Sequence, residues 1–326
     1  MNWRSKSKIA GAMPGKNGSS AALPAVMIEI ESGFVMGARL AGPHRTGLRR
    51  LAVSGVEAGI VEPSPLLPNV LQPQRLGDAI EAVSASLGNG GGRAGLILPD
   101  AAVRVNVLEF DTLPSKSKEI ESLLRWRVKD SLGFPSEEAM LSHQEIHRAE
   151  GKIELLVVAV RRAVVGQYEA AVEAARGGPV FTVPATLALL PLLPETGPGG
   201  QLLTHVCSGW VTHALVEGTR LRFWRTRQLA GAESAQQAGE VVSEAARAAA
   251  SARDRFGLQI TKSWLCSRPL ASRELKDALG GALGLPVEDL PVGNRLDAEL
   301  LADERPLFSM FAAPLAGLIA NGGRAS

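Results

Sequence analysis

The spacing of apolar residues along the chain predicts short buried strands interleaved with amphipathic helices. Between positions 74 and 87 the apolar residues recur at 76, 79, 80, 83 and 87, which is a helical period. By contrast, Val26 to Ile30 and Ile153 to Val160 are nearly continuous apolar runs, which is typical of buried strands. We predict strands at 26–30, 34–40, 48–53, 94–98, 103–110, 153–160, 202–207, 211–216, 220–225, 263–266 and 286–287. We predict helices at 74–87, 115–132, 161–175, 232–256, 272–283 and 307–320.

The order of these elements predicts a duplicated α/β plan. Each half opens with a strand–turn–strand unit and later adds strand–helix crossovers. The glycine-rich run at 197–200 is the clearest linker between the two halves.

The helix at 115–132 has clear start and stop signals. Ser115 or Ser117 is placed to cap its first turn, and Gly133-Phe134-Pro135 ends it. Trp126 lies among the apolar residues of this helix. Because an indole is so large, we expect it to pack beneath its lobe and Trp126→Ala to cost about 3–5 kcal/mol.

The composition is that of a folded protein, with 45% hydrophobic and 21% charged residues over 326 positions. The net charge is +2, but residues 1–24 hold four cations and no acid, so removing those four charges leaves −2 for the rest. We expect 1–24 to be a disordered basic tail, either purely solubilising or weakly attracted to anionic lipid.

Several kinds of site are disfavoured by residue counts and motifs. Two distant cysteines exclude a disulfide framework, and 4% aromatic residues disfavour a nucleic-acid surface. No apolar run is long enough for a membrane span or a secretory signal. His143 and His147 would suit zinc on a helix, but their segment is predicted to be extended, where four residues span about 13 Å. Residues 11–17 resemble a phosphate loop but lack its final Ser or Thr. We therefore predict no catalytic residue and no metal site.

The segment from Leu96 to Val172 carries motifs of a known family. In chain order they are Leu113-Pro114, Glu119-Ile120-Glu121, Leu124-Arg125-Trp126-Arg127-Val128 and Gly133-Phe134-Pro135-Ser136-Glu137-Glu138, followed by the strand and helix of Ile153 to Ala174. This pattern resembles that of the PilM family, the cytoplasmic actin-like proteins of type IV pilus assembly. The resemblance extends more weakly from Val26 to Ala320.

The resemblance implies an α/β, actin-like (ribonuclease H-like) fold with two lobes built from duplicated strand-hairpin and helix units. After the tail at 1–24 it implies a first lobe at 25–95 that also takes the C-terminal helix 307–321. A PilM-type inserted subdomain would follow at 96–180, and a shortened second lobe at 181–306. One subdomain of the nucleotide cleft is expected to be missing, because residues 230–265 hold only one predicted helix and one strand.

Such folds hold ATP by two strand–turn–strand phosphate loops and a glycine-rich adenosine loop, since glycine lets the backbone approach the ligand. In the first loop Glu31 stands where glycine is usual, and in the other loops bulkier residues replace the acid and the glycines. The degenerate positions are Glu29, Glu31, Ser32, Gly33, His205, Cys207, Cys266, Ser267 and Arg268. We expect a pseudo-ATPase without a bound cofactor, and ATP and Mg²⁺ would bind only if these loops still function. Cys207 and Cys266 fit buried structural thiols better than nucleophiles.

The resemblance also implies a partner. PilM-like proteins bind the short cytoplasmic N-terminus of PilN, so we expect a non-catalytic scaffold, cytoplasmic and peripheral to the inner membrane, that binds the N-terminal peptide of a PilN-like protein. The central segment, about Leu96 to Gly178, and the first hairpin would carry the peptide. A pilus motor ATPase and a second copy of the chain are further candidate partners; nucleic acid is not. Two alternatives stay open: an ATP-binding actin-like ATPase, and a cytoplasmic component of a type II secretion platform.

Overall fold

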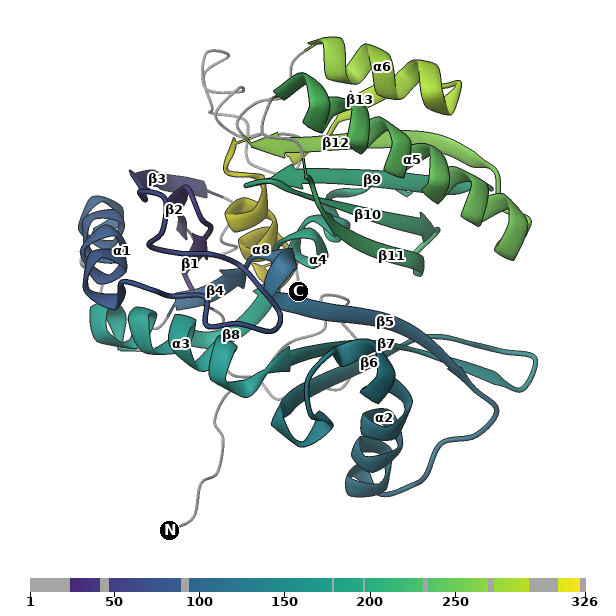
Figure 1. Cartoon of the computed structure of the whole chain (residues 1–326), viewed down its shortest axis with the longest axis horizontal. Coiled ribbons are helices and arrows are strands. Elements are labelled where there is room, and N and C mark those ends of the chain that lie inside the picture. Colours follow the sequence, from purple (N-terminus) through teal and green to yellow (C-terminus); the bar gives the residue numbers. More distant parts are fainter. Residues whose placement is uncertain are drawn as a thin grey trace.

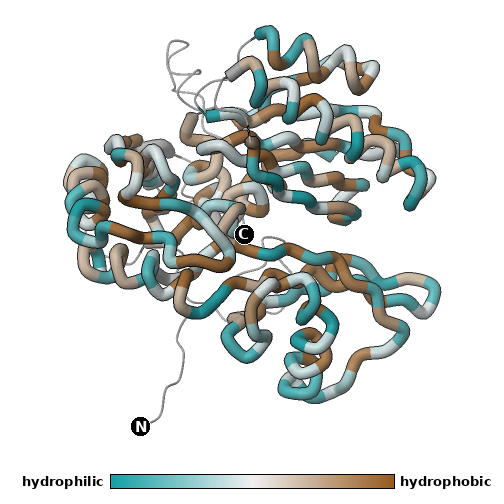
Figure 2. Tube along the Cα trace, viewed as in Figure 1, coloured by the Kyte–Doolittle hydropathy of each residue, from teal (hydrophilic) through white to brown (hydrophobic). Residues whose placement is uncertain are grey.

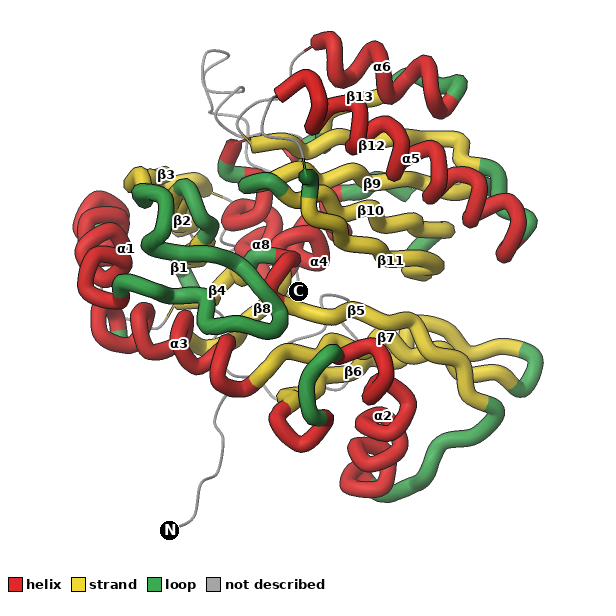
Figure 3. The backbone as a smooth tube through the Cα atoms, viewed as in Figure 1, coloured by secondary structure: helices red, strands yellow, loops and turns green. Residues whose placement is uncertain are grey.

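The computed structural model describes residues 24–41, 47–88, 94–177, 179–195, 197–230, 234–268, 273–292 and 310–322. They form two five-stranded sheets with flanking helices and one smaller three-stranded sheet (Figures 1 and 3). Figure 2 shows the apolar positions concentrated in the strands, with polar positions recurring along the outer helices. The expected tail lies outside the described residues, apart from its last position, as do residues 307–309 of the expected C-terminal helix.

Lobe I is built on the sheet of order β3-β2-β1-β4-β8. Its strands are β1 (Val26–Ile30), β2 (Phe34–Ala41), β3 (Gly47–Gly55), β4 (Ala94–Leu98) and β8 (Pro179–Pro184). The first three pair antiparallel, whereas β4 runs parallel to β1 and β8 parallel to β4.

Helices cover both faces of the lobe I sheet. On one face lie α1 (Pro73–Leu87) and α3 (Arg162–Arg176), and on the other α4 (Ala185–Leu189) and α8 (Ala312–Gly322). Gly37 permits the approach of α1, because a Cβ there would lie 2.6 Å from Leu87 and 2.8 Å from Val83. Gly317 lets α8 approach Met27 in the same way on the opposite face.

Lobe II repeats the same plan. Its sheet has the order β11-β10-β9-β12-β13, again an antiparallel meander followed by parallel strands. The elements are β9 (Gly200–Cys207), β10 (Trp210–Glu217), β11 (Arg220–Gln228), α5 (Ser234–Phe256), β12 (Ile260–Arg268), α6 (Arg273–Leu283) and β13 (Val287–Asp289). The duplicated plan predicted from sequence is therefore confirmed. Between β11 and β12 the described chain forms only α5.

Alternate residues of β9 point to opposite faces of its sheet. Leu202 packs with α5 and α6, whereas Leu203 belongs to the large core that also contains lobe I residues such as Met27 and Ile28. The two lobes therefore share one continuous apolar core.

The third sheet forms an inserted subdomain at 103–161. It contains β5 (Val103–Phe110), β7 (Lys152–Arg161) and β6 (Ala139–Ala149), all antiparallel, with α2 (Ser117–Leu132) against one face. The expected range of 96–180 was too wide, because β4 and β8 hydrogen-bond into the lobe I sheet. The insertion begins only after the short 3-10 helix η1 (Asp100–Ala102).

The structure decides two local predictions, the conformation around His143 and His147 and the cap of the helix that begins near residue 115. The segment of His143 and His147 is extended, as predicted, and forms the strand β6, which was not among the predicted strands, so the two imidazoles do not share a helix face. The serine cap was wrong: α2 begins at Ser117, its N-cap residue is Lys116, and no side chain caps the first turn. In addition, no helix of the described residues combines the length and apolarity of a bilayer span.

Candidate functional site

The degenerate loop positions converge at the contact between the two lobes. Glu29 is the penultimate residue of β1, and Glu31, Ser32 and Gly33 form the β1–β2 turn. His205 and Cys207 end β9, directly beside the end of β12, where Cys266 pairs with His205 and Arg268 with Cys207 in parallel register. The structure thus brings together residues that are far apart in sequence.

Arg268 and Glu29 form an ion pair between lobe II and lobe I. Their side chains are 1% and 0% exposed. The guanidinium also lies 5.3 Å from the centroid of the Phe34 ring and donates to Nε2 of His205 at 2.6 Å. Since arginine can only donate, Nε2 accepts and the proton of the neutral ring is on Nδ1.

The other nitrogen of His205 faces Asp100, which follows β4 in lobe I. Nδ1 lies 3.1 Å from Oδ2 of Asp100 and 2.7 Å from the hydroxyl of Thr186. Thr186, at the start of α4, donates its hydroxyl to Oδ2 and its backbone N–H to Oδ1 at 3.0 Å. Burial raises the pKa of Asp100, but the hydrogen bonds from His205 and Thr186 outweigh burial and leave this pKa lowered.

Sequence reasoning missed Asp100 and Thr186. One signal was present: an acidic residue that follows a buried strand through a proline lies at the edge of the sheet where loops meet. The partner residues are remote, however, because Asp100 is 86 positions from Thr186 and 105 from His205.

The pKa values of the other acidic groups at this contact are raised, which favours their uncharged forms. Burial raises the pKa of Glu31 well above its ordinary value, and the neighbouring Glu29 raises it further. Burial likewise raises the pKa of Cys207 well above its ordinary value and that of Cys266 to about 11. Both thiols are therefore protonated near neutral pH, and low-pKa nucleophilic chemistry is not supported there.

Side chains fill the space between the degenerate loops. The cavity that remains has a volume of about 10 Å³ and is lined by Glu31, Pro99, Asp100, Ala101, His205, Cys207, Trp210 and Thr212. A single water needs about 10–15 Å³. The β9–β10 turn is a two-residue hairpin in which Ser208 and Gly209 both have positive φ, 49° and 76°, so it is a tight turn. Among the described residues, no group of three or more His, Cys, Asp or Glu side chains is arranged to hold a metal ion.

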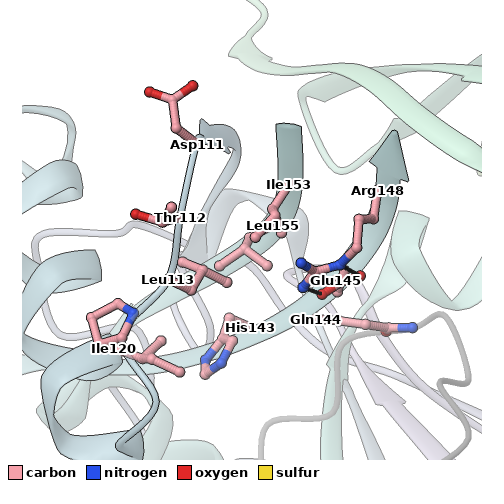
Figure 4. Close-up of a pocket in the computed structure, with 11 residues that line it drawn as sticks. Asp111, Thr112, Leu113, Ile120, His143, Gln144, Glu145, Arg148, Ile153 and Leu155 are labelled. Atoms are coloured by element: carbon pink, nitrogen blue, oxygen red, sulfur yellow. Dashed lines mark hydrogen bonds and ion pairs between the residues drawn. The ribbon is translucent and has the colours of Figure 1, made fainter. Parts of the chain in front are cut away.

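A much larger hollow of about 620 Å³ lies at the far end of the inserted subdomain (Figure 4). We call it the distal pocket. Its apolar walls are Leu113, Ile120, Ile153 and Leu155, and His143 points into it from β6. At its rim Arg148 pairs with Glu145 through two bonds of 2.8 and 2.6 Å. Burial lowers the pKa of His143, so the pocket presents a neutral imidazole.

Most of the exposed large apolar side chains lie on two adjoining elements away from the lobe contact. Of the five large apolar side chains exposed in the described chain, four lie on the loop before α1 or on α2: Leu66, Leu67, Leu71 and Trp126. We call these four the junction patch. Loop and helix meet where a Cβ on Gly133 would lie 3.1 Å from Leu66, and Arg161 donates to the Leu66 carbonyl at 2.5 Å.

The expectation that Trp126 packs in the core was wrong. Its side chain is 60% exposed, with the Lys129 ammonium 5.8 Å from the indole centroid. Leu124, Val128 and Leu132 are the buried residues of α2, and a residue two positions after Leu124 points about 200° away from it around the helix.

Comparison with solved structures identifies the fold. No protein-family model and no curated protein matches the sequence. A PilM-PilN type IV pilus biogenesis complex superposes with a TM-score of 0.77 at 18% identity, covering 93% of this chain and 100% of that chain. A Bacteroides thetaiotaomicron protein with an actin-like ATPase fold gives 0.52 at 10% identity, covering 87% and 95%. The chain has an actin-like fold.

The predicted resemblance to PilM is confirmed at the level of this fold. The cytoplasmic domain of EpsL from the type II secretion system of Vibrio cholerae is also similar, with a TM-score of 0.46 at 11% identity over 76% of this chain and 83% of that one. The loop positions that the resemblance assigned to ATP binding lie at the β1–β2 turn, at the end of β9 and at the end of β12. Those are the places occupied by the buried network around Arg268.

Proposed function

We propose that this chain is a non-catalytic actin-like scaffold of a type IV pilus or related secretion platform, which binds the cytoplasmic N-terminal peptide of a PilN-like membrane protein. The observation that carries the proposal is the junction patch, where exposed apolar side chains from lobe I and from the inserted subdomain lie on adjoining elements. Concentrated exposed apolar surface is typical of interaction sites.

The similarity to a PilM-PilN complex supports the choice of partner. A short peptide binds by inserting a few apolar anchors and adding backbone hydrogen bonds. Leu67, 65% exposed, and Trp126 are the side chains best placed to receive such anchors. A membrane-anchored partner would hold this chain at the cytoplasmic face of the inner membrane.

The filled interlobe cleft supports the non-catalytic part of the proposal. A triphosphate needs backbone donors and a cation, whereas the described cleft presents Glu29, Glu31 and Asp100 to the place where phosphates would lie. The carboxylates of Glu29 and Asp100 would repel the phosphates, and Glu31 adds a third acidic side chain at the same place.

Calorimetric titration tests the peptide site. The probe is a synthetic peptide with the cytoplasmic N-terminal sequence of a PilN-like single-span membrane protein from the same organism. Wild type should bind it, and Leu67→Ser and Trp126→Ala should each weaken binding by about tenfold or more, the loss of a hot-spot contact. Val53→Ser is the matched control, since Val53 is 51% exposed but lies on β3, outside the patch.

A second variant distinguishes the two surfaces. Leu113→Ser alters the distal pocket and leaves the junction patch intact. If Leu113→Ser abolishes binding while Leu67→Ser and Trp126→Ala do not, the peptide binds the distal pocket and the proposed location is wrong. If folded wild type shows no binding at about 100 μM peptide, a concentration that detects even weak complexes, the partner itself is wrong.

A further inference from the structure

The polar contacts between the two lobes divide by chemical type. Glu29 and Asp100 come from lobe I, whereas Arg268 and His205 come from lobe II. Lobe I therefore presents anionic groups and lobe II presents donors, and each donor meets a partner across the contact. None of these four residues belongs to the junction patch, so the network is separate from the proposed peptide site.

Burial makes this pairing obligatory. A charge without a partner is very costly in a protein interior, and the Arg268 and Glu29 side chains have almost no contact with water. If the lobes separated, both charges would lose their partners or become hydrated. Closed lobes are thus the arrangement in which these two charges are paired with each other.

Arg268 contacts both lobes at once. Its planar guanidinium offers five donors in a fixed fork, which suits several acceptors simultaneously. It reaches the Glu29 carboxylate and the Phe34 ring in lobe I while it donates to His205 in lobe II. Two-lobed proteins close when a ligand makes contacts to both lobes, and here a side chain makes them.

We propose that Arg268 is a built-in cationic ligand of the interlobe cleft, which holds the lobes closed without an external ligand, and that its removal leaves a site for a free guanidinium ion. The site would be formed by Glu29, His205 and the face of Phe34. The residual cavity of about 10 Å³ agrees with a site already filled by its own ligand.

Thermal unfolding of Arg268→Ala, with and without about 50 mM guanidinium chloride, tests this proposal. That concentration is far below the denaturing range, and equal NaCl controls for ionic strength. Guanidinium weakly destabilises ordinary proteins, so the Tm of wild type should fall slightly. The Tm of Arg268→Ala should instead rise, because the ion restores the missing cation.

Leu279→Ala is the matched control. Leu279 is fully buried in lobe II among apolar residues, so its truncation destabilises the protein without exposing an anionic site. Its Tm should fall with guanidinium, as in wild type. If the Tm of Arg268→Ala also falls, there is no vacated cation site and the proposal is overturned.

A distance measurement tests closure directly. Spin labels at Glu81→Cys on α1 and Glu274→Cys on α6 report the separation of the lobes, and both native cysteines are buried. Wild type and Arg268→Lys, which keeps the charge, should give one narrow distribution. Arg268→Ala should give a longer or broader one that guanidinium narrows.

A second variant tests the same proposal if Arg268→Ala does not fold well. Glu29→Gln keeps the size of the side chain but removes the anionic partner, so it should also broaden the distribution. An unchanged distribution in a folded Arg268→Ala or Glu29→Gln variant would show that other contacts close the lobes and that Arg268 does not.

Discussion

At the scale of single residues, Glu31 is a carboxyl group held away from water at the lobe contact. Burial and the neighbouring Glu29 raise its pKa well above the ordinary value of 4.5. The folded state therefore binds this proton more tightly than the unfolded chain does. Its contribution to stability is complete below the unfolded pKa and is lost as the pH rises toward the folded value.

Glu31→Gln should remove this loss, because an amide of the same shape carries no charge. We expect the Tm of the variant to exceed that of wild type at about pH 8 and the difference to shrink toward about pH 5. Differential scanning calorimetry over this range measures it. Glu137→Gln, at an exposed position of the short 3-10 helix before β6, should show no such trend. A wild type more stable than Glu31→Gln at high pH would contradict the argument.

Trp126 gives a second prediction at this scale. Because the indole is 60% exposed, Trp126→Ala should change the free energy of unfolding by less than about 0.5 kcal/mol. Leu124→Ala, on the buried side of the same helix, should cost about 2–5 kcal/mol. Urea unfolding of both variants compares the two faces of the helix. A decrease of about 3 kcal/mol in the free energy of unfolding for Trp126→Ala would contradict the exposed position and indicate that the indole is buried.

At the scale of elements, α3 anchors the loop that carries Leu66, Leu67 and Leu71. Asn69 donates from its side-chain amide to the Tyr168 hydroxyl at 3.1 Å, and its backbone N–H donates to Gln167 at 2.8 Å. Asn69 and Tyr168 are both fully buried. The shape of the junction patch therefore depends on two side chains of a helix that does not belong to it.

Tyr168→Phe should cost about 1–3 kcal/mol, since the buried Asn69 amide loses its acceptor. Hydrogen exchange of residues 60–71 should accelerate, and peptide affinity should fall although Tyr168 does not touch the patch. Ser86→Ala is a suitable control, because that exposed hydroxyl bonds only within its own helix, to Ala82. Unchanged exchange in Tyr168→Phe would show that other contacts hold the loop.

Most elements were predictable because their signals are local. The period of 74–87 and the apolar runs of β1 and β7 need no information from elsewhere in the chain. The angular position of Trp126 on the helix, about 200° from Leu124, also predicts that it points outward. The sequence prediction was wrong because it relied on the size of the indole instead. The cap of α2 was not predictable, because Ser115, Lys116 and Ser117 are adjacent and only backbone geometry decides between them.

At the scale of the whole molecule, the sequence singled out loop residues that lie at the lobe contact but not their mutual contacts. The Arg268–Glu29 and His205–Asp100 pairs join positions remote in the chain, and no periodicity reports such pairing. The predicted bounds of the inserted subdomain, 96–180, were too wide for the same reason. Whether β4 and β8 join one sheet or another is decided by long-range hydrogen bonds.

The closed contact leads to a prediction for nucleotide. A ligand that binds only the native state raises stability by RT ln(1 + [L]/Kd), which is about 2.7 kcal/mol at a hundredfold excess over Kd. About 5 mM Mg-ATP would therefore stabilise the protein clearly if Kd were about 50 μM. We expect no shift in Tm, because nucleotide would have to displace Arg268 from Glu29 and then face three buried acidic side chains.

The scan should compare Mg-ATP with Mg²⁺ and sodium triphosphate at equal ionic strength, so that non-specific anion effects cancel. Arg268→Gly is the informative second sample. It removes the side chain that fills the cleft but leaves Glu29, Glu31 and Asp100 in place, so it too should show no shift if carboxylate repulsion is sufficient. A rise in Tm with Mg-ATP for wild type would contradict the pseudo-ATPase proposal. A rise for Arg268→Gly alone would assign the loss of nucleotide binding to this single side chain.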